Sequence, residues 1–146
     1  MNHSIYPPLL VYNARMADLG RYNTLPILRR TDFGIFLDGG DLGDILLPRK
    51  YVTDSMQVGE QLKVFLYNDS EDRLIATTVQ PRAQVGECAY LKVVSTNHYG
   101  AFLDWGLPKD LLVPFSEQQQ KLQEGYSYTV FLFVDTETQR IAASTG

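Results

Sequence analysis

The chain repeats itself at an interval of 66 residues. Residues 20–79 align without a gap on residues 86–145, and about a third of the aligned positions are identical. An internal repeat of this kind indicates two copies of one structural module. We expect an N-terminal arm at residues 1–18, a first module at residues 19–80 and a second module at residues 84–146. Pro81 would end any strand between the two modules.

Each module has the sequence pattern of five short strands. In the first module, segments rich in β-branched and aromatic residues are separated by turn residues, at 23–30, 33–38, 45–48, 61–67 and 74–79. Residues 49–58 and their counterparts 115–124 are polar, which predicts a short helix or helical turn between the third and fourth strands. Five strands with this insert are typical of the OB fold. The expected fold is therefore all-β, with two tandem five-stranded OB barrels.

A motif in the second predicted strand carries a family resemblance. It has an aromatic residue, glycine, any residue, phenylalanine and an aliphatic residue, at 33–37 and again at 99–103. A glycine opens the fourth strand of each module, and an aspartate precedes an Ile-Ala pair near its end. The modules resemble the S1-like subclass of OB folds. Two longer runs, at residues 69–77 and 102–114, resemble the conserved virulence factor B family of tandem S1-like proteins.

This resemblance implies binding of single-stranded RNA, with single-stranded DNA as the alternative ligand, by a bacterial, cytoplasmic regulator. Members of the family carry further S1-like domains and a C-terminal winged-helix domain, so the chain is expected to be a fragment or a short form. In S1-like barrels the RNA lies over the second and third strands, where aromatic rings stack on bases and Arg or Lys contacts phosphates. The candidate RNA-binding residues are Arg29, Phe33, Phe36, Asp69 and Arg73 in the first module, and Lys92, His98, Tyr99, Phe102 and Trp105 in the second.

The direction of several aromatic rings stays open at the level of sequence. Side chains alternate along a strand, so Phe33 and Phe36 point to opposite faces unless a bulge at Gly34 brings both rings outward. Trp105 is either an exposed stacking platform or a ring that caps the end of a barrel. Four tyrosines are expected to be packing residues: Tyr22, Tyr90, Tyr126 and Tyr128.

The charge balance restricts how such a chain could hold RNA. There are 13 Lys+Arg against 17 Asp+Glu, a net charge of -4, which excludes a polycation that binds nucleic acid by bulk charge. The cations are denser in the first module, and Gln139 stands where the first module has Arg73. We therefore expect weak, salt-sensitive binding that depends on stacking, with the first module contributing more.

The sequence lacks the residue combinations that enzymatic catalysis would need. The histidines are His3, in the predicted arm, and His98, in a turn, and Cys88 is the single cysteine. Neither a nucleophile with a positioned base nor a zinc site or internal disulfide is expected from them. We expect no cofactor, no small-molecule substrate and no membrane segment. The alternative function is a protein-interaction or scaffolding module whose barrels do not bind nucleic acid.

Two pairs of carboxylates recur at the same places in both modules: Asp38 with Asp104, and Asp44 with Asp110. Such carboxylates could form a metal site. Turn carboxylates that accept hydrogen bonds from backbone amides explain the recurrence more simply. The sequence therefore favours no metal.

Overall fold

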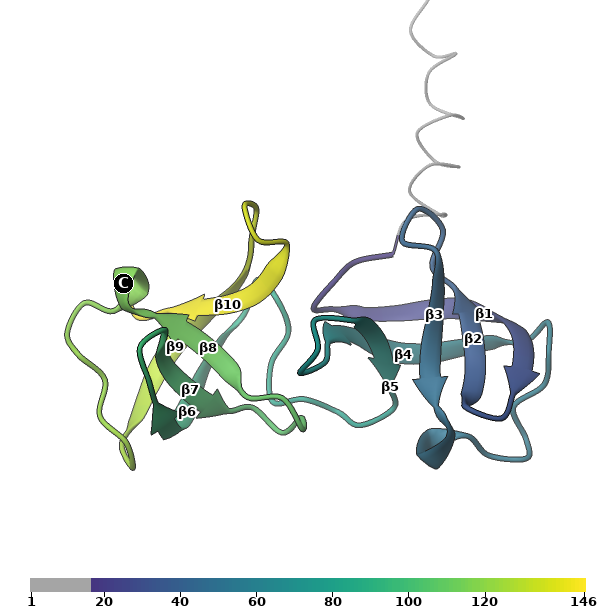
Figure 1. Ribbon diagram of the computed structural model, residues 1–146, viewed down its shortest axis with the longest axis horizontal. Helices are drawn as coiled ribbons and strands as arrows, with labels where there is room; N and C mark the ends of the chain where they lie inside the picture. The colour runs from purple at the N-terminus through teal and green to yellow at the C-terminus, as the bar shows by residue number, and fades with distance from the viewer. Residues whose placement is uncertain (1–16) are drawn as a thin grey trace, which may run out of the picture.

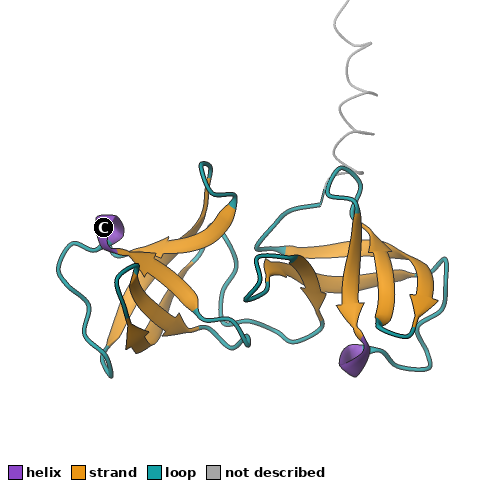
Figure 2. Cartoon of the chain, viewed as in Figure 1, coloured by secondary structure: helices purple, strands orange, loops and turns teal. Residues whose placement is uncertain are grey.

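Two small β-barrels follow one another along the chain (Figure 1). The computed structural model describes residues 17–146, so the predicted arm at residues 1–18 lies outside the described residues except for its last two. Within residues 17–146, strands joined by loops make up nearly all of the fold, and helix is confined to two short turns (Figure 2). The repeat in sequence is thus a repeat of structure.

The first barrel is closed by five strands. They are β1 (Tyr22–Thr31), β2 (Gly34–Asp38), β3 (Asp44–Pro48), β4 (Gln61–Asn68) and β5 (Leu74–Thr77). Their order around the barrel is β1-β2-β3-β5-β4, and the parallel pair β3 and β5 closes it. This is the predicted OB arrangement, and each strand agrees with its predicted segment to within two residues at either end.

The second barrel repeats this arrangement. Its strands are β6 (Cys88–Thr96), β7 (Gly100–Asp104), β8 (Leu111–Pro114), β9 (Ser127–Asp135) and β10 (Arg140–Ser144). They form a five-stranded sheet in the order β10-β9-β6-β7-β8, and its two edge strands, β8 and β10, lie against each other.

Alternate side chains of the strands fill the interior of each barrel. In β2 the inward side chains are Ile35 and Leu37, both fully buried, and in β7 they are Ala101 and Leu103. Burying one such aliphatic side chain contributes roughly 1.5–3 kcal/mol. The outward residues between them, Phe36 and Phe102, are therefore presented from strands that the core holds in place.

The predicted helical insert is reduced to one 3-10 turn in each barrel, η2 (Arg49–Tyr51) and η3 (Phe115–Glu117). The rest of each insert is loop, so a longer helix is not confirmed. In the second barrel, Gln118 Nε2 donates to the carbonyl of Val113 (3.0 Å), and its Oε1 accepts from the backbone N–H of Leu122 (2.9 Å). Side-chain bonds of this kind satisfy backbone groups that a helix would otherwise pair.

An apolar contact joins the two barrels. Phe65 and Tyr67 point outward from β4, yet both are buried in one cluster with the core of the second barrel. Trp105, in the loop between β7 and β8, packs edge-on against Phe65, with ring centroids 5.7 Å apart. The linker is also fixed, because the N–H of Val85 donates to the carbonyl of Gly20 (2.8 Å).

Candidate nucleic-acid interface

On the outer face of the first barrel, Phe36 lies between Arg29 of β1 and Leu46 of β3. A bulge in β1 at Leu28 brings Arg29, instead of Leu28, opposite Phe36. The guanidinium carbon of Arg29 lies 4.4 Å from the centroid of the Phe36 ring, and its Nη1 is 2.8 Å from Asp44 Oδ2. The face thus presents a half-buried ring with a cation over it.

Phe33 lies just before β2, in the turn from β1, and is 75% exposed. Because it precedes the strand, the alternation of side chains along β2 does not apply to it. Gly34 has φ +143°, and a Cβ there would collide with the carbonyl oxygen of Leu47. The hypothesis of a bulge at Gly34 is wrong, because Gly34 pairs in regular register with Thr31 and Pro48 and the bulge is in β1. Phe33 is nevertheless exposed and Phe36 is half-buried on the outer face.

The second barrel has the same outward ring at the same place. Phe102 lies between Ser95 of β6 and Leu112 of β8, and a bulge at Val94 repeats the one in β1. Tyr99 is 62% exposed in the turn before β7, and its ring centroid lies 4.1 Å from that of His98. Two further outward residues, Lys92 of β6 and Asp104 of β7, lie opposite each other in the register of these strands.

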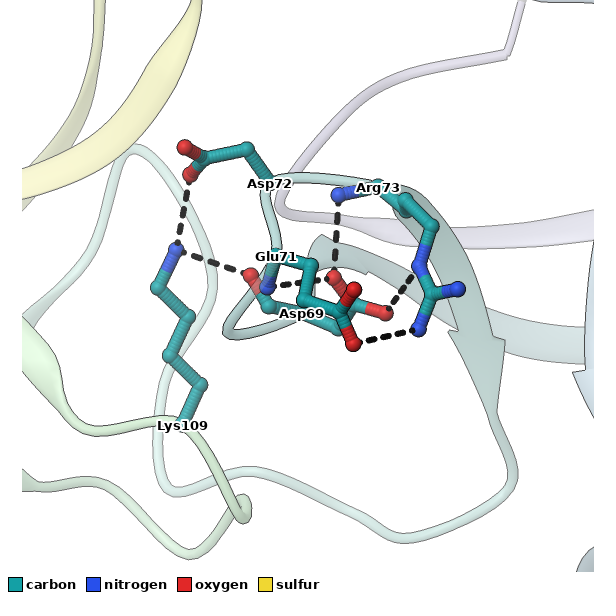
Figure 3. Close-up of polar contacts among 5 residues, drawn as sticks. All are labelled: Asp69, Glu71, Asp72, Arg73 and Lys109. Atoms are coloured by element: carbon teal, nitrogen blue, oxygen red, sulfur yellow. Dashed lines mark hydrogen bonds and ion pairs between the residues drawn. The ribbon is translucent and has the colours of Figure 1, made fainter.

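The turn between β4 and β5 brings Asp69 and Arg73 together (Figure 3). Asp69 Oδ1 accepts hydrogen bonds from the backbone N–H groups of Glu71 and Arg73, both 2.9 Å long. Burial alone would raise the pKa of the Asp69 carboxyl, but these two amides and the Arg73 guanidinium outweigh it and lower the pKa below its ordinary value. Asp69 is thereby an organiser of the turn.

Arg73 lies on the solvent side of that turn. Its side chain is 68% exposed, with Nε 3.0 Å from Asp69 Oδ2 and Nη2 3.2 Å from Glu71 Oε2. Exposed ion pairs of this kind contribute only about 0–1 kcal/mol, so a phosphate can compete for the guanidinium at small cost.

The same turn also contacts the second barrel through Asp72 (Figure 3). Asp72 Oδ1 lies 3.4 Å from Lys109 Nζ, and its Oδ2 lies 2.7 Å from Arg140 Nη2. Lys109 Nζ also donates to the carbonyl of Asp69 (3.1 Å). Two cations of the second barrel, Lys109 and Arg140, therefore bind the turn between β4 and β5 of the first barrel.

The Trp105 ring is not accessible to a ligand on this surface. It is only 3% exposed, and its indole Nε1 donates to the carbonyl of Lys109 (2.7 Å). Its proposed function as an exposed stacking platform is a prediction that the structure corrects, because the neighbouring barrel covers the ring. The alternative of a ring that packs at the end of a barrel describes it better.

The interpretation of the recurring aspartates as turn carboxylates that accept backbone hydrogen bonds holds for Asp38 and Asp104, but Asp44 instead forms an ion pair with Arg29. Asp38 Oδ1 accepts from the N–H of Gly40, and Asp104 Oδ1 accepts from the N–H of Gly106, both at 2.9 Å. Residues 17–146 contain no group of three or more His, Cys, Asp or Glu side chains placed to hold a metal ion. None of the helices in that range is long and apolar enough to cross a membrane.

Several exposed aromatic residues escaped the sequence analysis. Tyr90 and Tyr126, expected to pack, are 73% and 61% exposed, so that expectation was wrong for them. Phe115, at the start of η3, is also exposed and aligns with Arg49 of the first module. A comparison of the two modules for positions where an aromatic residue replaces a cation would have found Phe115.

Two OB barrels, each with an outward phenylalanine on its second strand, define the class of tandem S1-domain proteins. The S1 domain family matches the chain twice, at residues 19–79 and 85–145. The chain belongs to this family.

Three known proteins show what the chain resembles more narrowly. It is 38% identical to the uncharacterized protein YitL of Bacillus subtilis over 95 residues, which cover 64% of this chain and 32% of that protein. It is 33% identical to conserved virulence factor B of Staphylococcus epidermidis over 100 residues, covering 63% of this chain and 33% of that protein. A crystal structure from Streptococcus pneumoniae, described as a multidomain protein with nucleic acid binding domains, matches with a TM-score of 0.72 at 24% identity.

These similarities confirm the resemblance to the conserved virulence factor B family. The Streptococcus match covers 88% of this chain and 46% of that chain, and at its level of identity it shows the fold. The chain spans about a third of the length of the curated relatives given above.

Proposed function

We propose that the two barrels bind single-stranded RNA by stacking bases on the outward rings of β2 and β7. The observation that supports this most is the recurrence of one arrangement: Phe36 and Phe102 occupy equivalent places on the outer face, each with an exposed ring, Phe33 or Tyr99, in the turn before it. The barrel interior does not require these rings, since Ile35, Leu37 and their counterparts fill it.

Base stacking can supply the binding energy for RNA in a chain whose net charge is negative. Each base–aromatic contact contributes about 1–3 kcal/mol and tolerates any base, so a few contacts give binding without a sequence code. Arg29 already lies over Phe36, and its ion pair with Asp44 is half exposed. A base arriving on Phe36 displaces this guanidinium, which then becomes available to the adjoining phosphate.

The comparisons support nucleic acid as the kind of partner, because the chain consists of S1 domains and its structural neighbour is described by its nucleic acid binding domains. By the family resemblance, we place the chain in a bacterial post-transcriptional or virulence regulator of the cytoplasm. In this proposal it acts by binding and has no catalytic activity of its own.

A titration of the whole chain with single-stranded RNA at two salt concentrations tests the proposal. We expect binding at low salt that weakens as salt rises, with a logarithmic slope of about -0.7 for each phosphate contacted. No binding at low salt would overturn it. Salt-insensitive association of the chain with a protein, and none with RNA, would favour the interaction module instead.

A further inference from the structure

We infer that the first barrel has a hollow that binds a phosphate group, and that the second barrel lacks it. This inference deepens the proposed function, on which it rests, by assigning phosphate and base to different parts of the molecule. The hollow has a volume of about 220 Å³ and lies beside the turn between β1 and β2. It is lined by Arg30, Thr31, Asp32, Gly34, Arg49 and Val52.

The charges around the hollow favour an anion. Neither Arg30 nor Arg49 forms an ion pair with a carboxylate of residues 17–146, and both side chains are exposed. Arg30 Nη2 donates to the carbonyl of Met56, which fixes that guanidinium while leaving its other donors free. Among residues 17–146, Asp32 is the one carboxylate in the lining, so the lining holds two cations and one anion. A planar guanidinium matches two oxygens of a phosphate at once.

The exposed residue Phe33 lies in sequence between two residues that line the hollow. Its neighbours Asp32 and Gly34 both line the hollow, and the N–H of Arg49 donates to the carbonyl of Phe33 (2.9 Å). The ring and Arg49 are thus tied to each other through the backbone. One nucleotide can place its base on Phe33 and its phosphate between the two arginines.

The second barrel has a different surface at the corresponding place. Thr96 and Phe115 stand where the first barrel has Arg30 and Arg49, and His98 stands where it has Asp32. With Tyr99, the residues His98 and Phe115 make an exposed aromatic surface there. The first barrel is therefore suited to a phosphate and the second to bases.

A probe that contains no base tests the hollow separately from RNA binding. Inorganic pyrophosphate is titrated into the whole isotope-labelled chain, and backbone amide shifts are followed by NMR. We expect shifts at residues 30–34 and 49–52, and none at residues 96–100 and 115–118. Equal shifts in both barrels, or none in either, would overturn the inference whether or not RNA binds.

Three variants sharpen the test with pyrophosphate. Arg30→Gln with Arg49→Gln should abolish the shifts, whereas the matched pair Lys63→Gln with Lys121→Gln removes the same charge elsewhere and should leave them. Asp32→Asn should tighten pyrophosphate binding roughly threefold, because it removes a negative charge a few ångströms from the phosphate. An unchanged or weaker affinity of Asp32→Asn would count against the hollow.

The same variants separate this inference from the proposed function. With single-stranded RNA, the double arginine variant should flatten the salt slope by about 0.7, the value for one phosphate. Equal flattening by the lysine pair would show that bulk charge alone is responsible, and would overturn the hollow. Pyrophosphate binding in a chain that binds no RNA would keep the hollow and reject the RNA proposal.

Discussion

At the scale of single residues, one aspartate has a different environment in each of the two barrels. Asp44 of the first barrel pairs with Arg29 at 2.8 Å, but the residue aligned with Arg29 in the second barrel is Ser95. The equivalent carboxylate, Asp110, has its pKa raised above the ordinary value, first by burial and then by the charge of Asp104. Ionised Asp110 therefore destabilises the fold at neutral pH.

We predict that Asp110→Asn stabilises the protein at pH 7. When the pKa of a carboxyl is raised in the folded state, the protein loses stability as pH rises through that folded pKa. The gain in unfolding free energy from Asp110→Asn should therefore shrink as pH falls toward the ordinary pKa range of a carboxyl. Urea denaturation of both proteins across this range measures it. Asp44→Asn is the control and should instead lose up to about 1 kcal/mol. Equal stability of Asp110→Asn and the original chain at pH 7 would contradict this account.

At the scale of elements, the start of β2 depends on one glycine. Gly34 has φ +143°, and the carbonyl of Leu47 occupies the space where a Cβ would stand. Gly100 repeats both features against the carbonyl of Val113. A glycine at this position lets the turn deliver Phe33, or Tyr99, to the outer face while β2 and β3 remain paired.

We predict that Gly34→Ala destabilises the first barrel by more than about 3 kcal/mol, because backbone strain and a steric clash act together. Gly59→Ala is the matched control. Gly59 also has a positive φ, +92°, but nothing lies within 4 Å of its Cβ position, so only the strain of roughly 1–2 kcal/mol applies. Thermal unfolding of the two variants compares them, and equal losses would refute the explanation by close approach.

The elements also show where the sequence was sufficient and where it was not. Local alternation and turn residues predicted every strand, because those signals lie within a few residues. The bulge at Leu28 was not predictable, since it depends on pairing with β2. The pairing of the last two strands also differs between the barrels by one residue. Ile75 of β5 lies opposite Tyr67 of β4, but the equivalent Ile141 of β10 lies opposite Val134 of β9. The residue with positive φ in the connecting turn is Asp72 in the first barrel and Gln139 in the second.

At the scale of the whole molecule, one buried apolar cluster joins the two barrels. Phe65 is fully buried because the second barrel covers it, whereas its counterpart Phe131 is 45% exposed. Sequence could not distinguish the two, and it left Trp105 undecided for the same reason: their burial depends on contact between distant parts of the chain. Trp105 is the single tryptophan and therefore reports on this contact by its fluorescence.

We predict that Phe65→Ala costs about 3–5 kcal/mol and shifts the Trp105 emission to longer wavelength, since a large buried ring is lost from the contact. Phe131→Ala should do neither. In the original chain, denaturation followed by Trp105 fluorescence and by circular dichroism should coincide. Two separate transitions would show that the barrels unfold independently.

The affinity of the whole chain for single-stranded RNA, with and without its outward rings, tests the central claim most directly. Phe36→Ala and Phe102→Ala should each weaken binding about 5- to 150-fold, which corresponds to one lost stack, in protein shown by circular dichroism to be folded. Phe131→Ala removes an exposed ring outside the proposed interface and should leave the affinity unchanged. If all three variants bound RNA as tightly as the original chain, stacking on β2 and β7 would be contradicted.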